Sequence, residues 1–107
     1  MIETNIHITP VQVLVEALGH SGYARKGADI VCSAYSILFF ALAQSLQDEG
    51  VSVEINEQDS LKHISMQGDI GFRENILINY FRTGVIMLAK KYPTHVALPK
   101  QVGGINV

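Results

Sequence analysis

The sequence predicts an α+β fold: a small single domain with elements in the order β-β-α-β-β-α-β, in which two helices cover one face of a mixed or antiparallel sheet. Three observations predict it. Apolar and polar residues alternate with a period of two in several short segments. Two longer segments carry apolar residues three or four positions apart, as amphipathic helices do. The chain has 107 residues, 48% of them hydrophobic, which suits one domain with a real core.

The first two strands are predicted near the N-terminus. Residues 2–8 alternate between apolar or threonine side chains and more polar ones, and residues 11–18 alternate in a similar way after a Thr-Pro break. Because the connection is short, these strands are expected to pair as a hairpin. Gly19 and His20 stand where the second strand ends.

The first helix is predicted to start after Asp29 and to close at Gly50. Asp29 suits the N-cap because its carboxylate can accept a hydrogen bond from a free N–H group of the first turn. Apolar residues follow at helical spacing as far as Leu46, and two adjacent phenylalanines widen the apolar face. The helix is therefore expected to be well buried. Gly50 suits the left-handed position at which many helices stop.

A second pair of strands is predicted at residues 51–56 and 61–66, joined by a turn at residues 57–60. The second helix is expected to begin at Gly68-Asp69 and to end before Pro93, which cannot continue a helix. Its predicted apolar side consists of Phe72, Ile76, Leu77, Tyr80, Phe81, Val85 and Leu88.

A short last strand is expected at residues 95–98. The single domain then spans residues 1–99, and residues 100–107 form a C-terminal tail that is frayed or extended. The chain shows no internal repeat and no interdomain linker.

Composition narrows the function classes. Ten acidic residues against eight basic ones give a net charge of −2, so nucleic acid is not expected as a direct partner. No uninterrupted apolar run reaches the ~18 residues that span a bilayer, and the first residues lack the pattern of a secretory signal. A single cysteine excludes an intrachain disulfide, so a cytoplasmic location is expected.

The segment from Gly19 to Cys32 carries the candidate chemistry. It contains the only cysteine, a histidine twelve residues earlier and a glycine-rich loop between them. With Asp29 as N-cap, Cys32 falls in the first helical turn, where free N–H groups and the helix dipole favour a thiolate. His20 is then the candidate general base, or the cation of an ion pair.

Two neighbouring side chains have alternative roles. Asp29 either orients His20, as the third member of a triad does, or only caps the helix. Ser36, one turn after Cys32, either donates a hydrogen bond to the thiolate or bonds its own helix backbone. The N–H groups of residues 30–33 are candidates for an oxyanion hole.

Non-catalytic explanations of the same residues stay open. A lone cysteine in an apolar helix is most often a small buried hydrophobe, and a histidine near a strand end is most often a surface residue. The remaining histidines have no metal-site spacing, so no metal is expected. No phosphate-binding loop is present, and no cofactor is expected. Two aromatic sets are assigned to the core or to a dimer contact: Tyr35, Phe39 and Phe40, and Phe72, Tyr80 and Phe81.

One string is more specific. Gly-His-Ser-Gly-Tyr-Ala at residues 19–24, followed by Gly-x-Asp-Ile-Val-Cys-Ser-Ala at residues 27–34 and by Ser36, resembles the ribosomal-processing cysteine protease (Prp) family. The resemblance implies a cytoplasmic bacterial cysteine endopeptidase, usually a homodimer. Such an enzyme removes an N-terminal extension from a large-subunit ribosomal protein, cutting after an aromatic residue in a short apolar motif. The family's nucleophile falls on Cys32 and its histidine on His20.

The resemblance also assigns the supporting residues. The motif aspartate and serine fall on Asp29 and Ser36. The family's flexible loop falls on residues 21–28, which are expected to act as a gate that orders over the substrate. Ser21 stands where alanine is common, and Tyr35 where a small aliphatic residue is common, which leaves pocket shape and substrate preference open. The expected gating residues are Gly19, Ser21, Gly22, Tyr23 and Gly27.

Other functions remain as alternatives. A phage-associated processing protease would act on capsid or scaffold proteins. A non-catalytic module would bind a peptide by adding it as a strand to an exposed sheet edge. A thiol redox sensor would lack a resolving cysteine within the chain. A peptide or protein substrate is the expected partner, and a homodimer is expected from the small chain, its two apolar helices and the resemblance.

Overall fold

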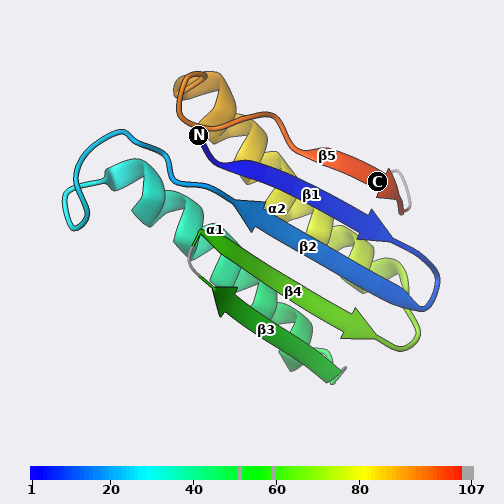
Figure 1. Ribbon diagram of the computed structural model, residues 1–107. Helices are drawn as coiled ribbons and strands as arrows, with labels where there is room; N and C mark the ends of the chain where they lie inside the picture. Colours follow the sequence, from blue (N-terminus) through cyan, green and yellow to red (C-terminus); the bar gives the residue numbers. More distant parts are fainter. Residues whose placement is uncertain (51, 59, 105–107) are drawn as a thin grey trace.

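The computed structural model describes residues 1–50, 52–58 and 60–104, which form one five-stranded sheet and two helices (Figure 1). The order β-β-α-β-β-α-β is confirmed. In chain order the elements are β1 (Glu3–Ile8), β2 (Gln12–Leu18), α1 (Ile30–Asp48), β3 (Ser52–Gln58), β4 (Leu61–Gln67), α2 (Phe72–Lys91) and β5 (Lys100–Gly103).

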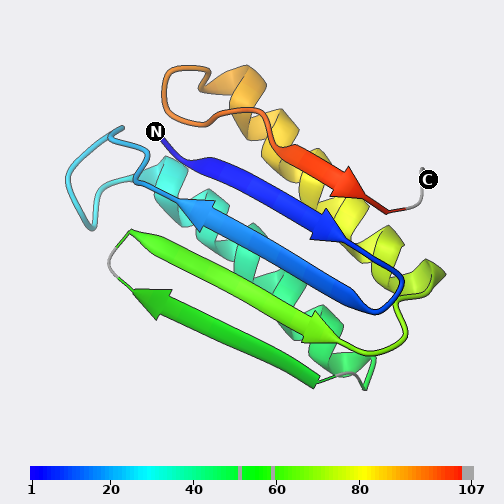
Figure 2. The ribbon, with the colours of Figure 1, turned by 45° about the vertical axis from the view of Figure 1, so that its right-hand side comes forward.

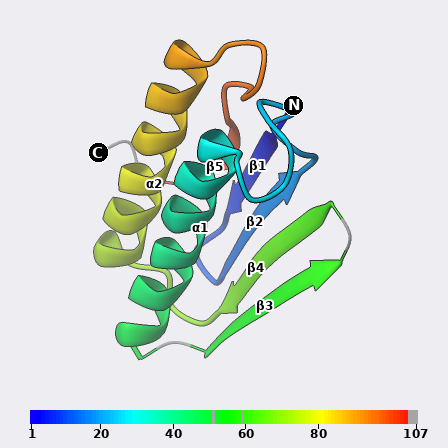
Figure 3. The ribbon, with the colours of Figure 1, turned by 90° about the vertical axis from the view of Figure 1, so that its left-hand side faces the viewer.

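The sheet is mixed, with strand order β3-β4-β2-β1-β5. β1 and β2 pair as the predicted antiparallel hairpin, β4 pairs antiparallel with both β2 and β3, and β5 alone runs parallel to its neighbour β1. Both helices lie on the same face of the sheet, which is clearest edge-on in Figure 3, while Figure 2 shows the opposite face uncovered. The predicted α+β class, with two helices on one face, is therefore confirmed.

The core lies between the sheet and the helices. Alternation along β1 turns Thr4, Ile6 and Ile8 toward the helices, as a period of two requires. Tyr35 and Phe39 of α1 meet Phe81 of α2 with ring centroids 6.2 and 6.3 Å away. These three aromatic side chains are at most 3% exposed, so their assignment to the core is confirmed.

By length and composition alone α1 could cross a membrane. The core helix of a soluble protein meets the same criterion. α1 packs against the sheet and α2 through six buried side chains: Val31, Tyr35, Phe39, Leu42, Ala43 and Leu46.

Two predicted boundaries shift. β3 continues to Gln58, so the turn is shorter than the predicted one at residues 57–60. Val51 of the predicted strand and Asp59 of the predicted turn lie outside the described residues. α2 begins at Phe72 rather than at Gly68-Asp69. The reason is that the N–H groups of Gly68 and Ile70 donate to the carbonyls of residues 11 and 10, which hold this segment against the turn between β1 and β2.

The predicted apolar side of α2 is partly wrong. Phe81 and Val85 are buried, whereas Phe72, Ile76 and Tyr80 are exposed. Apolar residues surround most of this helix, so spacing alone does not select one face; contact with the sheet and α1 does. The side chains that α2 buries are Asn75, Ile78, Phe81, Val85 and Ala89.

The predicted strand at residues 95–98 is wrong in its position. Only Val96 pairs there, as an isolated parallel bridge with Ile2. The final strand is β5, inside the segment predicted to be a tail, and it continues the parallel pairing along β1. Pro99 separates the two because it has no N–H group to donate. The proposed boundary after Pro99 stays a prediction, and residues 105–107 of that tail lie outside the described residues.

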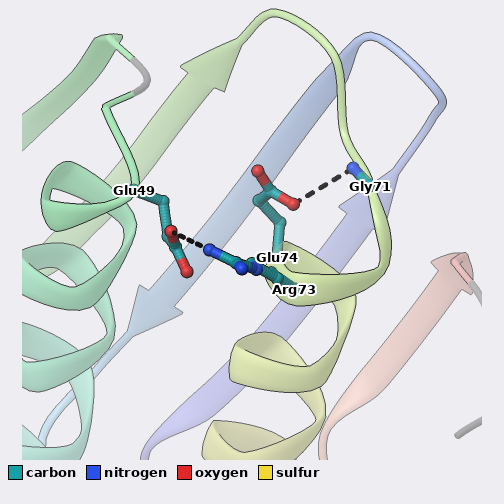
Figure 4. A network of polar contacts seen from close by, with 4 residues as sticks. All are labelled: Glu49, Gly71, Arg73 and Glu74. Atoms are coloured by element: carbon teal, nitrogen blue, oxygen red, sulfur yellow. Dashed lines mark hydrogen bonds and ion pairs between the residues drawn. The ribbon is translucent and has the colours of Figure 1, made fainter.

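The two helices are also joined at their ends on the side away from the candidate site. Arg73 in the first turn of α2 lies 3.5 Å from the carboxylate of Glu49, which caps α1 (Figure 4). The Glu74 carboxylate accepts a hydrogen bond from the Gly71 N–H at 3.1 Å, satisfying a free donor of the helix start. An exposed ion pair contributes little by itself, so this end is held mainly by the packed helix faces.

Gly19 is a site where the fold requires glycine. Its φ is +88°, and an added Cβ would lie 2.3 Å from the Met1 carbonyl oxygen. Gly50 has a similar φ of +82° with open space around it. We expect Gly50→Ala to lower the free energy of unfolding by about 1 kcal/mol, from backbone strain alone, and Gly19→Ala to lower it by at least about 1 kcal/mol more. Urea unfolding of both variants measures the two free energies of unfolding. Equal losses in the two variants would contradict a clash between a Cβ at residue 19 and the Met1 carbonyl.

Candidate active site

The site is built on the first turn of α1. Asp29 is the N-cap, as predicted: its Oδ1 accepts from the Cys32 N–H at 2.9 Å, and its carbonyl accepts from the Ser33 N–H at 3.1 Å. Cys32 is the third residue of the helix and half-buried. Its side chain therefore lies near the positive end of the helix dipole, where negative charge on sulfur is favoured.

The loop before α1 folds back onto this turn through Ser21. The Ser21 side chain is only 2% exposed, and its hydroxyl donates to Asp29 Oδ2. The Ser21 Oγ in turn accepts a hydrogen bond from the Tyr23 N–H at 3.2 Å and one from the Cys32 S–H, with Sγ 3.3 Å away. One buried hydroxyl thus links the loop, the helix cap and the sulfur.

A second anchor ties the loop to the end of α2. The Ser21 carbonyl lies 2.8 Å from His95 Nδ1, and since a carbonyl only accepts, that nitrogen carries the proton. The Tyr23 ring packs edge-on against Tyr92 and His95, with centroids 5.5 and 5.4 Å away. The loop is therefore fixed by aromatic contacts as well as by Ser21.

The Asp29 carboxylate is held in its charged form. The hydrogen bond from Ser21 is the main reason that the pKa of Asp29 lies well below its usual range. Burial opposes the shift, and the N–H groups of Cys32 and Ala24 reinforce it. All the polar partners found around this carboxylate belong to the loop and the helix start, and none is His20. The alternative in which Asp29 orients His20 is therefore not realised in this arrangement.

A cavity of about 600 Å³ opens beside Cys32. Cys32, His20 and Ser36 all line it, so the predicted site residues share one cavity. They are not brought into a bonded set, however: no hydrogen bond joins Cys32 to His20 or to Ser36 in the described part of the chain. The position beside the sulfur is taken by Ser21, and His20 is exposed. The two alternatives for Ser36 stay predictions.

Tyr35 lines the same cavity from within α1. Its hydroxyl is 2.5 Å from Thr4 Oγ1, and burial raises the pKa of Tyr35 to about 12 although the Thr4 hydrogen bond opposes this. Tyr35 is therefore neutral at physiological pH and serves as a wall of the cavity rather than as a proton carrier.

The predicted oxyanion hole is smaller than expected. Of the N–H groups at residues 30–33, those of Cys32 and Ser33 are taken by Asp29, which leaves Ile30 and Val31 as candidates. Across residues 1–50, 52–58 and 60–104, no group of three histidine, cysteine or acidic side chains could hold a metal ion. The groups that line the cavity include the Cys32 thiol and the His20 imidazole.

A model of the cysteine protease Prp family matches residues 1–97. The chain belongs to the Prp family. The matched residues include the whole site, from the β1–β2 hairpin to His95, which holds the loop. The family is one of cysteine proteases, and the sequence contains a single cysteine.

Solved structures share the fold. The ribosomal processing protease Prp from S. aureus, crystallised with a covalently linked product peptide, aligns with a TM-score of 0.79 at 17% identity, covering 95% of this chain and 100% of that one. SMU.848 from Streptococcus mutans aligns with a TM-score of 0.67 at 26% identity, covering 95% and 94%. S. aureus Prp with a substrate peptide aligns with a TM-score of 0.60 at 15% identity, covering 95% and 98%. No curated protein sequence matches significantly.

Sequence patterns missed one part of the site. Tyr92 and His95 hold the loop, yet they lie about seventy positions beyond it and form no local motif with it. The only local signal there is the Tyr92-Pro93 pair, in which Pro93 predicts the end of the helix and nothing links Tyr92 to the loop. Ser21 and Tyr23 were assigned to the gating loop, but their contacts with Asp29, Cys32 and His95 could not be read from spacing.

The lowered pKa of Asp29 makes the free energy of unfolding depend on pH in the acidic range. Because the folded state lowers its pKa, the unfolded state takes up the proton first once pH falls below the ordinary value of 3.8. The stabilisation is therefore complete near neutrality and is lost as pH drops from about 5 toward 2. We expect Asp29→Asn to flatten this loss in urea unfolding measured across the range. The exposed Asp69→Asn serves as the control and should keep the wild-type slope; equal slopes for all three proteins would contradict the assignment.

Proposed function

We propose that this protein is a cysteine endopeptidase in which Cys32 is the nucleophile and His20 transfers protons. The observation that carries the proposal is the position of the only cysteine: in the first turn of α1, beside a cavity that His20 also lines. Membership of a cysteine protease family supports it, because no other thiol is available in the sequence.

The reaction follows from these groups. His20 takes the proton of the Cys32 thiol, and the thiolate attacks the carbonyl carbon of the scissile peptide bond. In this proposal the oxyanion is stabilised by the dipole of α1 and by the free N–H groups of its first turn, for which Ile30 and Val31 are the candidates. His20 then protonates the leaving amine, and water hydrolyses the resulting thioester, which regenerates the thiol.

His20 must approach Cys32 for this chemistry, so the loop has to rearrange. Gly19, Gly22 and Gly27 all have φ between +65° and +90°, and all three belong to the loop or its start. Glycine is free of the side-chain clash that restricts this region for other residues, which lets the segment change conformation. We therefore assign residues 21–28 as a gate that orders over bound substrate.

The proposed substrate is the N-terminal extension of a large-subunit ribosomal protein, cut after an aromatic residue in a short apolar motif. Two observations support it. S. aureus Prp, which shares this fold, is named a ribosomal processing protease, and Ile2, Ala17 and Tyr35 give the cavity apolar walls. A cytoplasmic location is part of this proposal, since ribosomal proteins are made there.

A homodimer is also proposed. α2 leaves Phe72, Ile76, Tyr80 and Met87 between 43% and 76% exposed, and Ile37 on the adjacent α1 is 72% exposed. Large apolar side chains gathered on one helix layer are typical of a protein interface. A second copy of the chain is the occupant that a small domain of this size would gain most from.

Substitution of the two catalytic residues tests the activity. With a peptide that carries an apolar-aromatic cleavage motif, we expect Cys32→Ala to lower kcat/KM by at least about 10³-fold, because no nucleophile remains. His20→Ala is expected to lower it by about 10²-fold or more. Cleavage is followed by mass spectrometry of the products.

Ser65→Ala is the control, because Ser65 alternates with the buried Ile64 and Met66 of β4, so it faces the uncovered side of the sheet, and it does not line the cavity. A Cys32→Ala protein that cuts as fast as wild type would overturn the proposal. Peptides from phage capsid or scaffold proteins are tested as a second set of substrates. If these are cut faster, the substrate is a phage protein, and the roles of Cys32 and His20 are unchanged.

The dimer is tested by sedimentation velocity at micromolar concentration. We expect wild type to sediment as a dimer and Tyr80→Glu to shift it to monomer, because burying the new charge at an apolar interface is costly. Gln12→Glu adds the same charge at an exposed position of β2 and should leave the dimer intact. A monomeric wild type would contradict the proposal.

A further inference from the structure

The hydroxyl of Ser21 has a complete set of hydrogen bonds. A serine hydroxyl has one proton to donate and accepts up to two hydrogen bonds. Here the proton goes to Asp29 Oδ2, while the Tyr23 N–H at 3.2 Å and Cys32 Sγ at 3.3 Å approach the oxygen. The contact between Sγ and the Ser21 oxygen is a hydrogen bond only if Cys32 is a protonated thiol that donates its own proton. A thiolate in the same place would face an oxygen lone pair with no proton between them.

Burial limits the hydrogen-bond partners that Ser21 and Asp29 can reach. Ser21 is 2% exposed and Asp29 is 8% exposed, so solvent has little access to exchange partners with either group. The Asp29 carboxylate and a Cys32 thiolate would compete for the single Ser21 proton. Asp29 holds that proton in the structure, so the closed loop is matched to a neutral sulfur.

We propose that Ser21 is a positioning residue that keeps Cys32 protonated and unreactive while the loop is closed. This deepens the proposed function and rests on it. When the loop withdraws Ser21, the sulfur loses its acceptor and remains beside the helix start and the cavity that His20 lines. Loop movement and thiol activation are therefore one event, which limits reaction of the thiol in the absence of substrate.

The remaining titratable groups around the sulfur come from several elements. His20 and Lys26 line the cavity from the loop, Tyr35 from α1 and Lys62 from β4, in addition to Asp29. Tyr23 of the loop packs edge-on against His95. A Ser21→Ala change leaves all of these groups in the sequence and removes the one hydroxyl that both Cys32 and Asp29 contact.

Alkylation of Cys32 by iodoacetamide, followed by mass spectrometry across a pH series without substrate, tests the proposal. We expect Ser21→Ala to move the midpoint of the pH profile to lower pH. A move of half a pH unit corresponds to about threefold faster alkylation below the midpoint. The midpoint separates this effect from simple exposure of the thiol, which raises the limiting rate without moving the midpoint.

Three further variants sharpen the result. Ser21→Thr keeps the hydroxyl and should keep the wild-type midpoint, and Ser65→Ala should also keep it. Tyr23→Ala retains Ser21 but removes the aromatic contacts with Tyr92 and His95, so it should move the midpoint in the same direction as Ser21→Ala. This variant also serves if Ser21→Ala does not fold.

A midpoint that stays or rises in Ser21→Ala would overturn the proposal, as would an unchanged midpoint in Tyr23→Ala if Ser21→Ala does not fold. A rise would mean that the hydroxyl serves the thiolate instead. The readout needs no peptide cleavage. A lower midpoint in a protein that cuts no peptide would therefore refute the endopeptidase while leaving the role of Ser21 intact, and cleavage with an unmoved midpoint would do the reverse.

Discussion

The hydrogen bonds of the Asp29 carboxylate are the interaction on which the site depends. One oxygen caps α1 by accepting from the Cys32 N–H, and the other accepts from the Ser21 hydroxyl and the Ala24 N–H. The cap fixes where the helix begins, and thus where Cys32 lies relative to the helix dipole. The second oxygen fixes the loop that covers the sulfur. A single buried charge therefore sets both the position of the Cys32 sulfur and the access to it.

The fold brings the remaining parts to the same end of the domain. β2 ends at Leu18 and leads into the loop, and the C-terminus of α2 lies beside the loop and the start of α1 (Figure 1). The segment after α2 is held by the parallel bridge between Val96 and Ile2, which places His95 against the Ser21 carbonyl. Parallel pairing of β5 with β1 continues that contact along the sheet. The C-terminal third of the chain is therefore part of the support for the loop.

Local sequence signals were enough for much of this structure. The alternation in β1 and β2, Asp29 as a cap and Gly50 at φ +82° act through neighbours in the sequence, and the structure confirms them. Interactions between distant segments could not be predicted in the same way. The buried face of α2 is selected by the surfaces that it packs against, and the position of the last strand depends on which residues pair with Ile2 and β1. Likewise, Cys32 and His20, which the motif singles out, line one cavity, but the hydrogen bond between Cys32 and Ser21 depends on how the loop closes.

In the proposed mechanism, the thiol at the start of α1 reacts only after the loop has exchanged Ser21 for His20 beside the sulfur. The most direct measurement is a crystal structure of the protein with a peptide bearing a thiol-reactive carbonyl carbon, such as an aldehyde, joined covalently to Cys32. The expected result is a His20 ring nitrogen within about 3–4 Å of Sγ or of the bound carbonyl oxygen, with the Ser21 hydroxyl withdrawn from the sulfur. A covalent complex in which Ser21 still contacts Sγ and no His20 nitrogen lies near Sγ or the bound carbonyl oxygen would contradict it.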